Sequence, residues 1–487
     1  MKKSGYLMPV ASLPSDYGIG DFGPNAYEFI DIMVESGLSI WQILPLNPLG
    51  YGNSPYQPYS SLAGDDIYIS LDKLIEMNLL SSEDIMKVEF NQNIIEYDNA
   101  RINKNKYLKI SFENFKKSNL GDDFKNYLDK NEWVYKYAVF LTLKKHNNFK
   151  CWIEWPEEEK NWIKDMKFDL KPFEDEIAYE MYLQYIFYTQ WINLRRYANQ
   201  KGIQVMGDIP IYVGIDSLDV WDNQECFILD QDGNPTFVAG VPPDYFSETG
   251  QRWGNPIYDW EYIKRNNFDF WIERLKGNID LFDIIRIDHF RAFDTYWKIP
   301  SSCDTAIEGE WVEAPGFDMF DALFKAVPNA NIVVEDLGDL RPEVHTLRDH
   351  YNFKGMKIIQ FTFDPNETNN DFVDRENMII YTGTHDNQTI KGWFNSQSDD
   401  IQNQTTKFLK QKGFTGNIED AMIEYCFSNI ANMAIVPVQD VIGLDDTGRL
   451  NTPGTVGSPN WEWKLDNFKI LNIKKDFINA LNMKYRN

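Results

Sequence analysis

Eight short apolar segments recur along the chain, and their spacing limits the folds that it can adopt. Most are almost continuously apolar, which is typical of parallel strands that are covered on both faces. Six of the eight are followed directly by Gly, Pro, Asn or Asp, the residue types that end strands and form turns. The segments are residues 5–10, 39–46, 203–209, 282–287, 331–335, 356–363, 378–382 and 433–438.

Helical patterns fall between several of these predicted strands. Residues 24–36 begin after a Gly-Pro pair and end at Gly37, and residues 173–200 form a long aromatic-rich segment closed by Gly202. Strands that alternate with helices predict an α/β fold, here a TIM (β/α)8 barrel. A doubly wound sheet would give the same alternation, but no Gly-x-Gly-x-x-Gly turn follows a strand to support it.

The gaps between strands are uneven, which predicts subdomains inserted in the βα loops of a single catalytic domain, residues 1–487. Residues 71–171 are polar, charged and helix-like, and they predict a helical insertion. Residues 212–271 are rich in Gly, Pro and aromatic residues and predict a second insertion, and residues 300–324 predict a small third one. Insertions would account for the length beyond the roughly 250 residues of a minimal barrel.

Acidic residues lie where four of the predicted strands end. Asp208 closes the third strand, Asp288 the fourth and Glu335 the fifth, and Asp386 follows the seventh. The C-terminal ends of barrel strands meet at one mouth, where enzymes of this fold carry their catalytic groups. One such acid alone fits a turn or a cap, but four with Arg and His between them predict a site.

Carboxylates that converge in this way suit the cleavage of a glycosidic bond. One carboxylate attacks the anomeric carbon while a protonated carboxylic acid donates its proton to the leaving oxygen. Alternation along the strand puts Arg286 on the same side as Asp288, and a guanidinium there suits a charged nucleophile. Glu335 must instead keep its proton, and we expect the charges of Asp288 and Asp386 to raise its pKa. Asp336 should face away from the barrel lumen.

Composition narrows the class of ligand. The chain has 48 basic and 74 acidic residues and a net charge of −26, which repels phosphate backbones and anionic lipid, so we expect neither nucleic acid nor a membrane as partner. Its 15 Trp, 26 Tyr and 32 Phe hint at carbohydrate, although most such rings fill cores.

Four scattered cysteines predict neither a zinc site nor a disulfide framework, and together with the lack of a signal peptide or a long apolar run they predict a cytoplasmic location.

Motifs along nearly the whole chain resemble those of the amylomaltase, or disproportionating-enzyme, family of 4-α-glucanotransferases. The two most specific are Gly-Val-Pro-Pro-Asp-Tyr-Phe-Ser at 240–247 and Gly-Gln-Arg-Trp-Gly-Asn-Pro at 250–256. The resemblance implies a barrel of the α-amylase type that acts without a nicotinamide, phosphate or metal cofactor. The other motifs lie at residues 13–15, 17–23, 41–46, 52–56 and 451–455.

Carried over residue by residue, the resemblance assigns roles at the barrel mouth. It makes Asp288 the nucleophile, Glu335 the general acid/base and Asp386 the stabiliser of the transition state. The reaction implied is the retaining transfer of α-1,4-glucan segments, from maltooligosaccharides or other glucans, to the 4-OH of an acceptor glucan or glucose. The sequence sets no oligomeric state. Sugar contacts are implied for Ser54, Tyr56, Asp208, Asp244, Trp253, Arg286, Phe361 and His385.

The catalytic trio alone does not separate a transferase from an α-1,4-glucan hydrolase of the α-amylase type, because both form the same glycosyl-enzyme. Residues 240–256 favour transfer. They place Tyr245, Phe246 and Trp253 on a backbone stiffened by two prolines, and an aromatic flap there would exclude water and stack on an acceptor sugar. A glucan-binding protein without activity is a third reading, and the intact trio argues against it.

Overall fold

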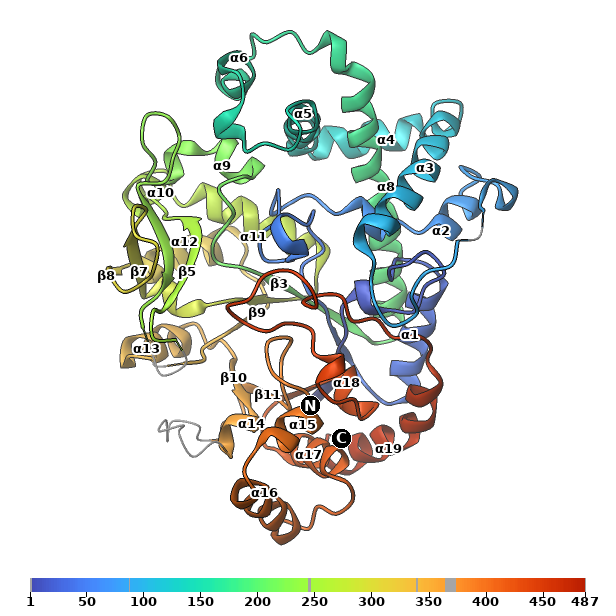
Figure 1. Cartoon of the computed structure of the whole chain (residues 1–487), viewed down its shortest axis with the longest axis vertical. Helices are drawn as coiled ribbons and strands as arrows, with labels where there is room; N and C mark the ends of the chain where they lie inside the picture. Colours follow the sequence, from blue (N-terminus) through green and yellow to red (C-terminus); the bar gives the residue numbers. More distant parts are fainter. Residues whose placement is uncertain (1, 87, 244–246, 339, 364–373, 487) are drawn as a thin grey trace.

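Eight parallel strands form the central sheet of the molecule (Figure 1). The chain is described by a computed structural model over residues 2–86, 88–243, 247–338, 340–363 and 374–486. The sheet runs in the order β10-β11-β12-β1-β2-β3-β6-β9. The strands are β1 (Lys3–Leu7), β2 (Ile40–Gln42), β3 (Gln204–Ile209), β6 (Ile284–Ile287), β9 (Ile332–Val334), β10 (Gly355–Ile358), β11 (Met378–Tyr381) and β12 (Met433–Pro437).

The two ends of this order meet, so the sheet closes into a barrel. Val333 of β9 forms a parallel bridge with Lys354, the residue before β10, and the Val334 N–H donates to the Lys354 carbonyl at 2.9 Å. Every other neighbouring pair is parallel as well. The eight predicted strands and the TIM-type barrel are therefore confirmed, and closure rules out the doubly wound alternative.

Several predicted strands run past the observed ones: the run 5–10 is a strand only up to Leu7, and the run 39–46 only over Ile40–Gln42. The apolar run 356–363 is a strand only up to Ile358, after which residues Ile359–Thr362 form the short helix α14. Ile359 and Gln360 are buried, and the Gln360 side chain donates to the Gln388 carbonyl at 2.8 Å. A continuous apolar run fits a buried helical turn as well as a buried strand, so periodicity does not mark where one becomes the other.

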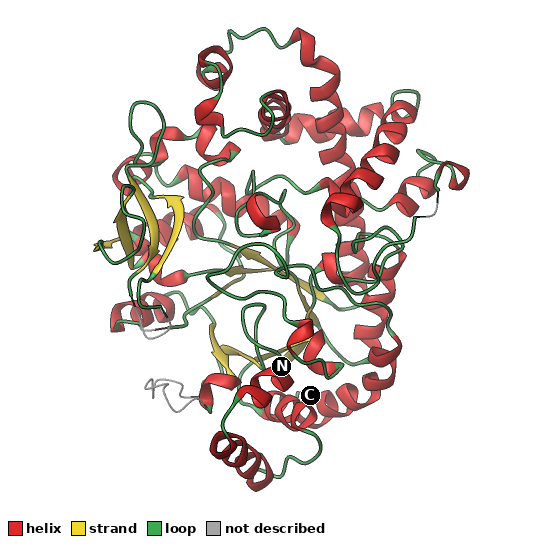
Figure 2. Ribbon diagram, viewed as in Figure 1, coloured by secondary structure: helices red, strands yellow, loops and turns green. Residues whose placement is uncertain are grey.

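Helices surround the barrel, and Figure 2 shows the strands in the middle of the molecule with helices around them. The first, α1, begins at Pro24, whose fixed φ suits the first turn, and ends before Gly37, which adopts a φ of 70°. The long predicted helix is α8. Helix bounds are α1 Pro24–Glu35, α2 Leu71–Glu76, α3 Tyr97–Phe115, α4 Gly121–Lys130, α5 Trp133–His146, α6 Glu157–Lys160, α7 Trp162–Asp165, α8 Glu174–Gln200, α9 Leu218–Asp222, α10 Trp260–Arg265, α11 Asp269–Leu281, α12 Gly316–Ala326, α13 Pro342–His350, α14 Ile359–Thr362, α15 Ile390–Ser396, α16 Asp399–Gln411, α17 Ile418–Ser428, α18 Val438–Val441 and α19 Lys469–Tyr485.

Two groups of elements lie outside the barrel wall. Helices α3, α4, α5 and α6 gather at the top and upper right of Figure 1. A second, antiparallel sheet lies at the left, in the order β5-β4-β7-β8. It joins strands from two segments that are separate in the sequence. The division of the chain into a barrel and three insertions stays a prediction. Its strands are β4 (Phe237–Val241), β5 (Gln251–Pro256), β7 (Thr295–Pro300) and β8 (Glu310–Glu313).

The core between barrel and helices depends on large aromatic side chains. Trp41 of β2 is fully buried and packs edge-on against Phe29 of α1, with ring centroids 5.3 Å apart. Its indole N–H donates to the Met8 carbonyl at 2.8 Å. Trp41 thus joins two strands and a helix with one side chain.

Replacing Trp41 by Ala should lower the free energy of unfolding by about 3–5 kcal/mol, because a large buried ring is lost and a cavity is left. Trp41→Phe should cost less, since the ring contact with Phe29 is partly kept. Some cost should remain, because the Met8 carbonyl loses its donor. Denaturant unfolding measures both. Ile473→Ala on α19, where the side chain is 76% exposed, is the control and should change stability by less than about 0.5 kcal/mol. Equal losses in Trp41→Ala and Ile473→Ala would contradict this account of the core.

Candidate active site

The four predicted acids lie at the C-terminal mouth of the barrel. Asp208 is the fifth residue of β3, and Asp288 and Glu335 directly follow β6 and β9. The Asp288 N–H donates to the Ile209 carbonyl and the Glu335 N–H to the Ile287 carbonyl, each at 2.9 Å. These bonds extend the barrel ladder by one residue, so Asp288 and Glu335 are held on rigid neighbouring strand ends.

Arg286 links two of these acids beneath the mouth. Its Nη1 lies 2.6 Å from an Asp208 oxygen and 2.9 Å from Asp288 Oδ1, so the expected contact with Asp288 is present. The arginine is buried. Burial disfavours its charge, but the carboxylates of Asp208 and Asp288 outweigh that effect and raise the pKa of Arg286.

Glu335 is held by the main chain on both oxygens. Oε2 accepts from the His289 N–H at 2.8 Å, and Oε1 accepts from the Leu337 N–H at 3.0 Å. Burial raises the pKa of Glu335 to about 7, and the charge of Asp288 adds to this while Arg286 opposes it. The expectation from sequence had the direction right but the cause incomplete, since burial is the largest cause and Asp386 is not among the main ones.

Asp386 has a partner on each oxygen. His385 Nε2 lies 3.2 Å from Oδ2, and Asn451 Nδ2 donates to Oδ1 at 2.6 Å. Burial alone would raise the pKa of Asp386, but these two partners hold it at about 2. Sequence reasoning assigned no role to Asn451, although the residue opens the motif at 451–455.

Tyr56 forms one wall of the site. Its hydroxyl donates to Asp208 Oδ2 at 2.8 Å, and its ring stacks on His385 with centroids 5.0 Å apart and an interplanar angle of 16°. Burial and the nearby Asp208 charge raise the pKa of Tyr56 well above its usual range, so the hydroxyl stays a donor. Ser54 lies two residues earlier, and its hydroxyl accepts from the Tyr56 N–H at 3.3 Å.

Trp253 reaches the site from the antiparallel sheet. It lies in β5 and meets the ring of His289 edge-on, with centroids 4.8 Å apart and planes at 87°. Burial lowers the pKa of His289 to about 4, so Trp253 contacts a neutral imidazole. His289 adopts a left-handed φ of 51°, a conformation that is uncommon for residues other than glycine.

The remaining residues predicted from the sequence are Asp336, Phe361 and Asp244. Asp336 points away from the lumen as expected, since its carboxylate pairs with Arg348 at 2.7 Å. Phe361 lies in α14, at the C-terminal end of β10, and is partly buried. Asp244, together with Tyr245 and Phe246 of the predicted flap, lies outside the described residues.

Comparison with known proteins gives the family. A family model described as 4-alpha-glucanotransferase matches residues 8–470. The chain belongs to the 4-alpha-glucanotransferase family. A relative of that name from Streptococcus pneumoniae is 40% identical over 472 residues, covering 95% of this chain and 93% of its own. One from Synechocystis is 42% identical over 480 residues, with the same coverage.

A solved structure agrees with this assignment. The amylomaltase from Streptococcus agalactiae, solved in complex with acarbose, superposes with a TM-score of 0.95 at 34% identity, covering 100% of this chain and 99% of its own. The activity is therefore that of a 4-alpha-glucanotransferase, a transferase, and the hydrolase alternative is not favoured.

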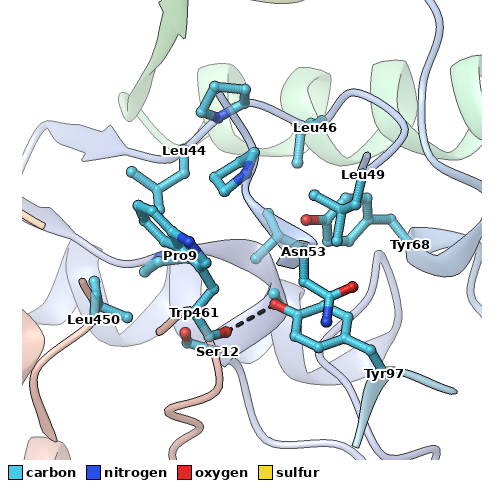
Figure 3. Close-up of a pocket in the computed structure, with 14 residues that line it drawn as sticks. Pro9, Ser12, Leu44, Leu46, Leu49, Asn53, Tyr68, Tyr97, Leu450 and Trp461 are labelled. Atoms are coloured by element: carbon cyan, nitrogen blue, oxygen red, sulfur yellow. Dashed lines mark hydrogen bonds between the residues drawn. The ribbon is translucent and has the colours of Figure 1, made fainter. Parts of the chain in front are cut away.

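An apolar pocket of this 4-alpha-glucanotransferase is lined in part by Trp461 (Figure 3), which also connects the pocket to the site. The Trp461 ring centroid is 5.8 Å from that of Tyr56 and 5.9 Å from that of His385. Its carbonyl accepts from the Tyr97 hydroxyl at 2.8 Å. The pocket is lined by Pro9, Val10, Ala11, Ser12, Leu44, Pro45, Leu46, Leu49, Asn53, Pro55, Tyr68, Tyr97, Leu450 and Trp461.

Two features are absent from the described residues. No group of three or more His, Cys, Asp or Glu within them is arranged to hold a metal ion. No helix in the same part of the chain is long and apolar enough to cross a membrane.

The raised pKa of Glu335, about 7, should make stability depend on pH. The folded state disfavours the charged carboxylate, so the protein keeps its full stability below the ordinary Glu pKa of about 4.5 and loses part of it as pH rises through about 7. Glu335→Gln has no charge to bury, so the Tm of this variant relative to the unmodified enzyme should rise between pH 5 and pH 8. Calorimetry over that range measures the difference.

The control for this measurement is Glu313→Gln, whose side chain is 84% exposed and which should leave Tm almost unchanged throughout the range. A Tm difference for Glu335→Gln that does not change with pH would show that burial does not disfavour the charge of Glu335.

Proposed function

We propose that the enzyme moves α-1,4-glucan segments between maltooligosaccharides by a retaining double displacement, with Asp288 as nucleophile and Glu335 as general acid/base. The observation that carries this proposal is the Asp288–Glu335 pair itself. Arg286 binds one carboxylate, whereas burial raises the pKa of the other to about 7. Two acids with such different surroundings suit two different roles.

In the first step, Asp288 attacks the anomeric carbon of the donor. Its side chain is 30% exposed, so a carboxylate oxygen is open to the mouth while Arg286 holds Oδ1. Glu335 donates its proton to the glycosidic oxygen, and the shortened glucan leaves with a free 4-OH. The transferred segment is then bound to Asp288 as a covalent glycosyl-enzyme.

In the second step, the same groups run in reverse with a new acceptor. The carboxylate of Glu335 takes the proton from the 4-OH of an acceptor glucan or glucose, and the acceptor oxygen attacks the anomeric carbon. The bond to Asp288 breaks, and two inversions restore the α configuration. A pKa near 7 suits a group that must give and take the proton in turn.

Asp386 stabilises the positive charge that develops on the sugar ring and binds its hydroxyls. Its low pKa, about 2, keeps the carboxylate charged, as this role requires. His385 pairs with Asp386 and stacks on Tyr56, so His385 and Tyr56 are both placed to contact the sugar that Asp386 binds. Arg286 and Asp208 form the floor beneath it.

The remaining sugar contacts are part of the same proposal. Ser54 and Phe361 lie in segments that follow barrel strands, and Asp244 belongs to the predicted flap. Trp253, against His289, is placed to stack on an acceptor sugar and to keep water from the glycosyl-enzyme. A cytoplasmic place of action stays a prediction.

Purified enzyme given maltotriose alone should yield glucose and a ladder of longer maltooligosaccharides, because each transfer lengthens one chain as it shortens another. Chromatography of the products at successive times measures this. Glucose and maltose that accumulate without longer chains would instead indicate hydrolysis. Asp288→Ala serves as the inactive control.

Substitutions should separate the two carboxylate roles. Asp288→Ala should abolish covalent trapping by a fluorinated glycosyl donor, which mass spectrometry detects.

Glu335→Gln should lose transfer from maltooligosaccharides by on the order of 100-fold or more but keep much more activity on a donor whose leaving group needs no proton. Because the pKa of Glu335 is raised to about 7, kcat/KM of the unmodified enzyme should fall above that pH, and this fall should vanish in Glu335→Gln on the activated donor. Equal loss on both donors would contradict the acid role.

A further inference from the structure

The chain that follows the last barrel strand binds the loop that carries Asp386. We call residues 382–390, which follow β11, the Asp386 loop, and residues 440–451, which follow β12, the brace. The Asp386 loop contains His385 as well. The two segments are neighbours because β11 and β12 are paired in the barrel.

The base of the Asp386 loop is closed by one buried carboxylate. Asp440 accepts from the Thr382 hydroxyl at 2.6 Å and from the Ile390 N–H at 2.7 Å. These are the first and last residues of the loop, so a single side chain fixes the distance between its ends. Asp446 adds a second attachment, since it accepts from the Thr389 N–H at 3.2 Å.

The tip of the loop is held through Arg449. Its Nη2 donates to the Asp386 carbonyl at 2.8 Å, and its Nε donates to the Asn451 carbonyl at 2.8 Å. The Asn451 N–H in turn donates to the His385 carbonyl at 3.1 Å. The planar guanidinium thus joins the main chain of the loop to the main chain of the brace, in a geometry that a lysine ammonium does not reproduce.

The side chain of Asn451 completes the path to the carboxylate. Its Nδ2 donates to Asp386 Oδ1 at 2.6 Å, on the side of the carboxylate opposite His385, which meets Oδ2. With a partner on each oxygen, the carboxylate is fixed in rotation as well as in position. The orientation of Asp386 therefore depends on where Asn451 lies, and Arg449 sets that.

We propose that Arg449 is a positioning residue that orients the Asp386 carboxylate through Asn451 without contacting the sugar. The proposal rests on the role given to Asp386 above. The Arg449 side chain donates its two hydrogen bonds within the described residues to main-chain oxygens, so it acts on the course of the chain. A displacement of about 1 Å at a catalytic group can cost on the order of 100-fold in rate, which gives the size of the effect.

The first measurement compares Arg449→Met with Arg195→Met. The control arginine also bridges elements, since it pairs with Asp283 at 2.7 Å and donates to the Asp280 carbonyl at 2.6 Å, but it lies at the opposite end of the barrel. Arg449→Met should lower kcat for maltotriose transfer by on the order of 100-fold and change KM by less than about 3-fold. Arg195→Met should lower Tm and leave kcat near that of the unmodified enzyme. Equal kcat in the two variants would overturn the proposal.

A double-mutant cycle with Asp386→Asn shows through which residue Arg449 acts. Rates are measured on a maltoside donor with an activated leaving group, so that slow variants can be followed. If Arg449 acts through Asp386, the double variant should be no more than about 3-fold slower than Asp386→Asn alone. If the two losses multiply, Arg449 has some other, general effect on the fold and the proposal is wrong.

The same cycle separates the proposal from the function on which it rests. Asp386→Asn with full activity would overturn the role of Asp386, and the role of Arg449 with it. A slow Asp386→Asn whose loss multiplies with that of Arg449→Met would overturn the role of Arg449 alone. Should Arg449→Met not fold, Arg449→Lys takes its place, because it keeps the charge and most of the length but does not hold two oxygens in one plane.

Discussion

The site depends on one buried guanidinium. Arg286 lies under the barrel mouth between Asp208 and Asp288, and removing it would leave the buried Asp208 carboxylate without its ion-pair partner, which typically costs about 3–5 kcal/mol. The cluster also takes in Tyr56, whose hydroxyl shares Asp208. The proposed nucleophile, Asp288, and the wall proposed to receive the sugar, Tyr56, are therefore held by one connected set of bonds through Asp208 and Arg286.

The difference between the two carboxylates proposed to be catalytic, Asp288 and Glu335, follows from the groups that each one contacts. Asp288 meets a cation, whereas Glu335 meets two main-chain N–H groups in a partly buried position. Those N–H groups favour a charged carboxylate, yet burial and the Asp288 charge outweigh them and keep the pKa near 7. One of the N–H groups belongs to His289, directly after Asp288, so the peptide unit between these two residues links the proposed nucleophile to the proposed acid.

The sequence was sufficient to predict features that follow from a repeated local pattern. It was insufficient to predict contacts between residues that lie far apart in the chain. Eight apolar runs predicted the barrel, and strand ends predicted Asp208, Asp288, Glu335 and Asp386 at one mouth, because both follow from local pattern and from the geometry of parallel strands. The change from β10 to α14 at Ile358 was missed because burial looks alike in both. The role of burial at Glu335 and the bond from Asn451 to Asp386 depend on contacts between residues distant in the chain, which a pattern of single residues does not encode.

The antiparallel sheet carries a consequence for how this barrel can be altered. Strand β7 begins at Thr295, seven residues after Asp288, and pairs with β4, which leads into the predicted flap. The predicted flap is thus anchored to the chain that follows Asp288, and its own loop ends are only part of its support. A graft of residues 237–256 alone onto another barrel would keep the pairing of β4 with β5 but leave β4 without β7, its other neighbour. The transferable unit is the pair of segments 237–256 and 295–313, which are separate in the sequence and continuous only as hydrogen-bonded strands.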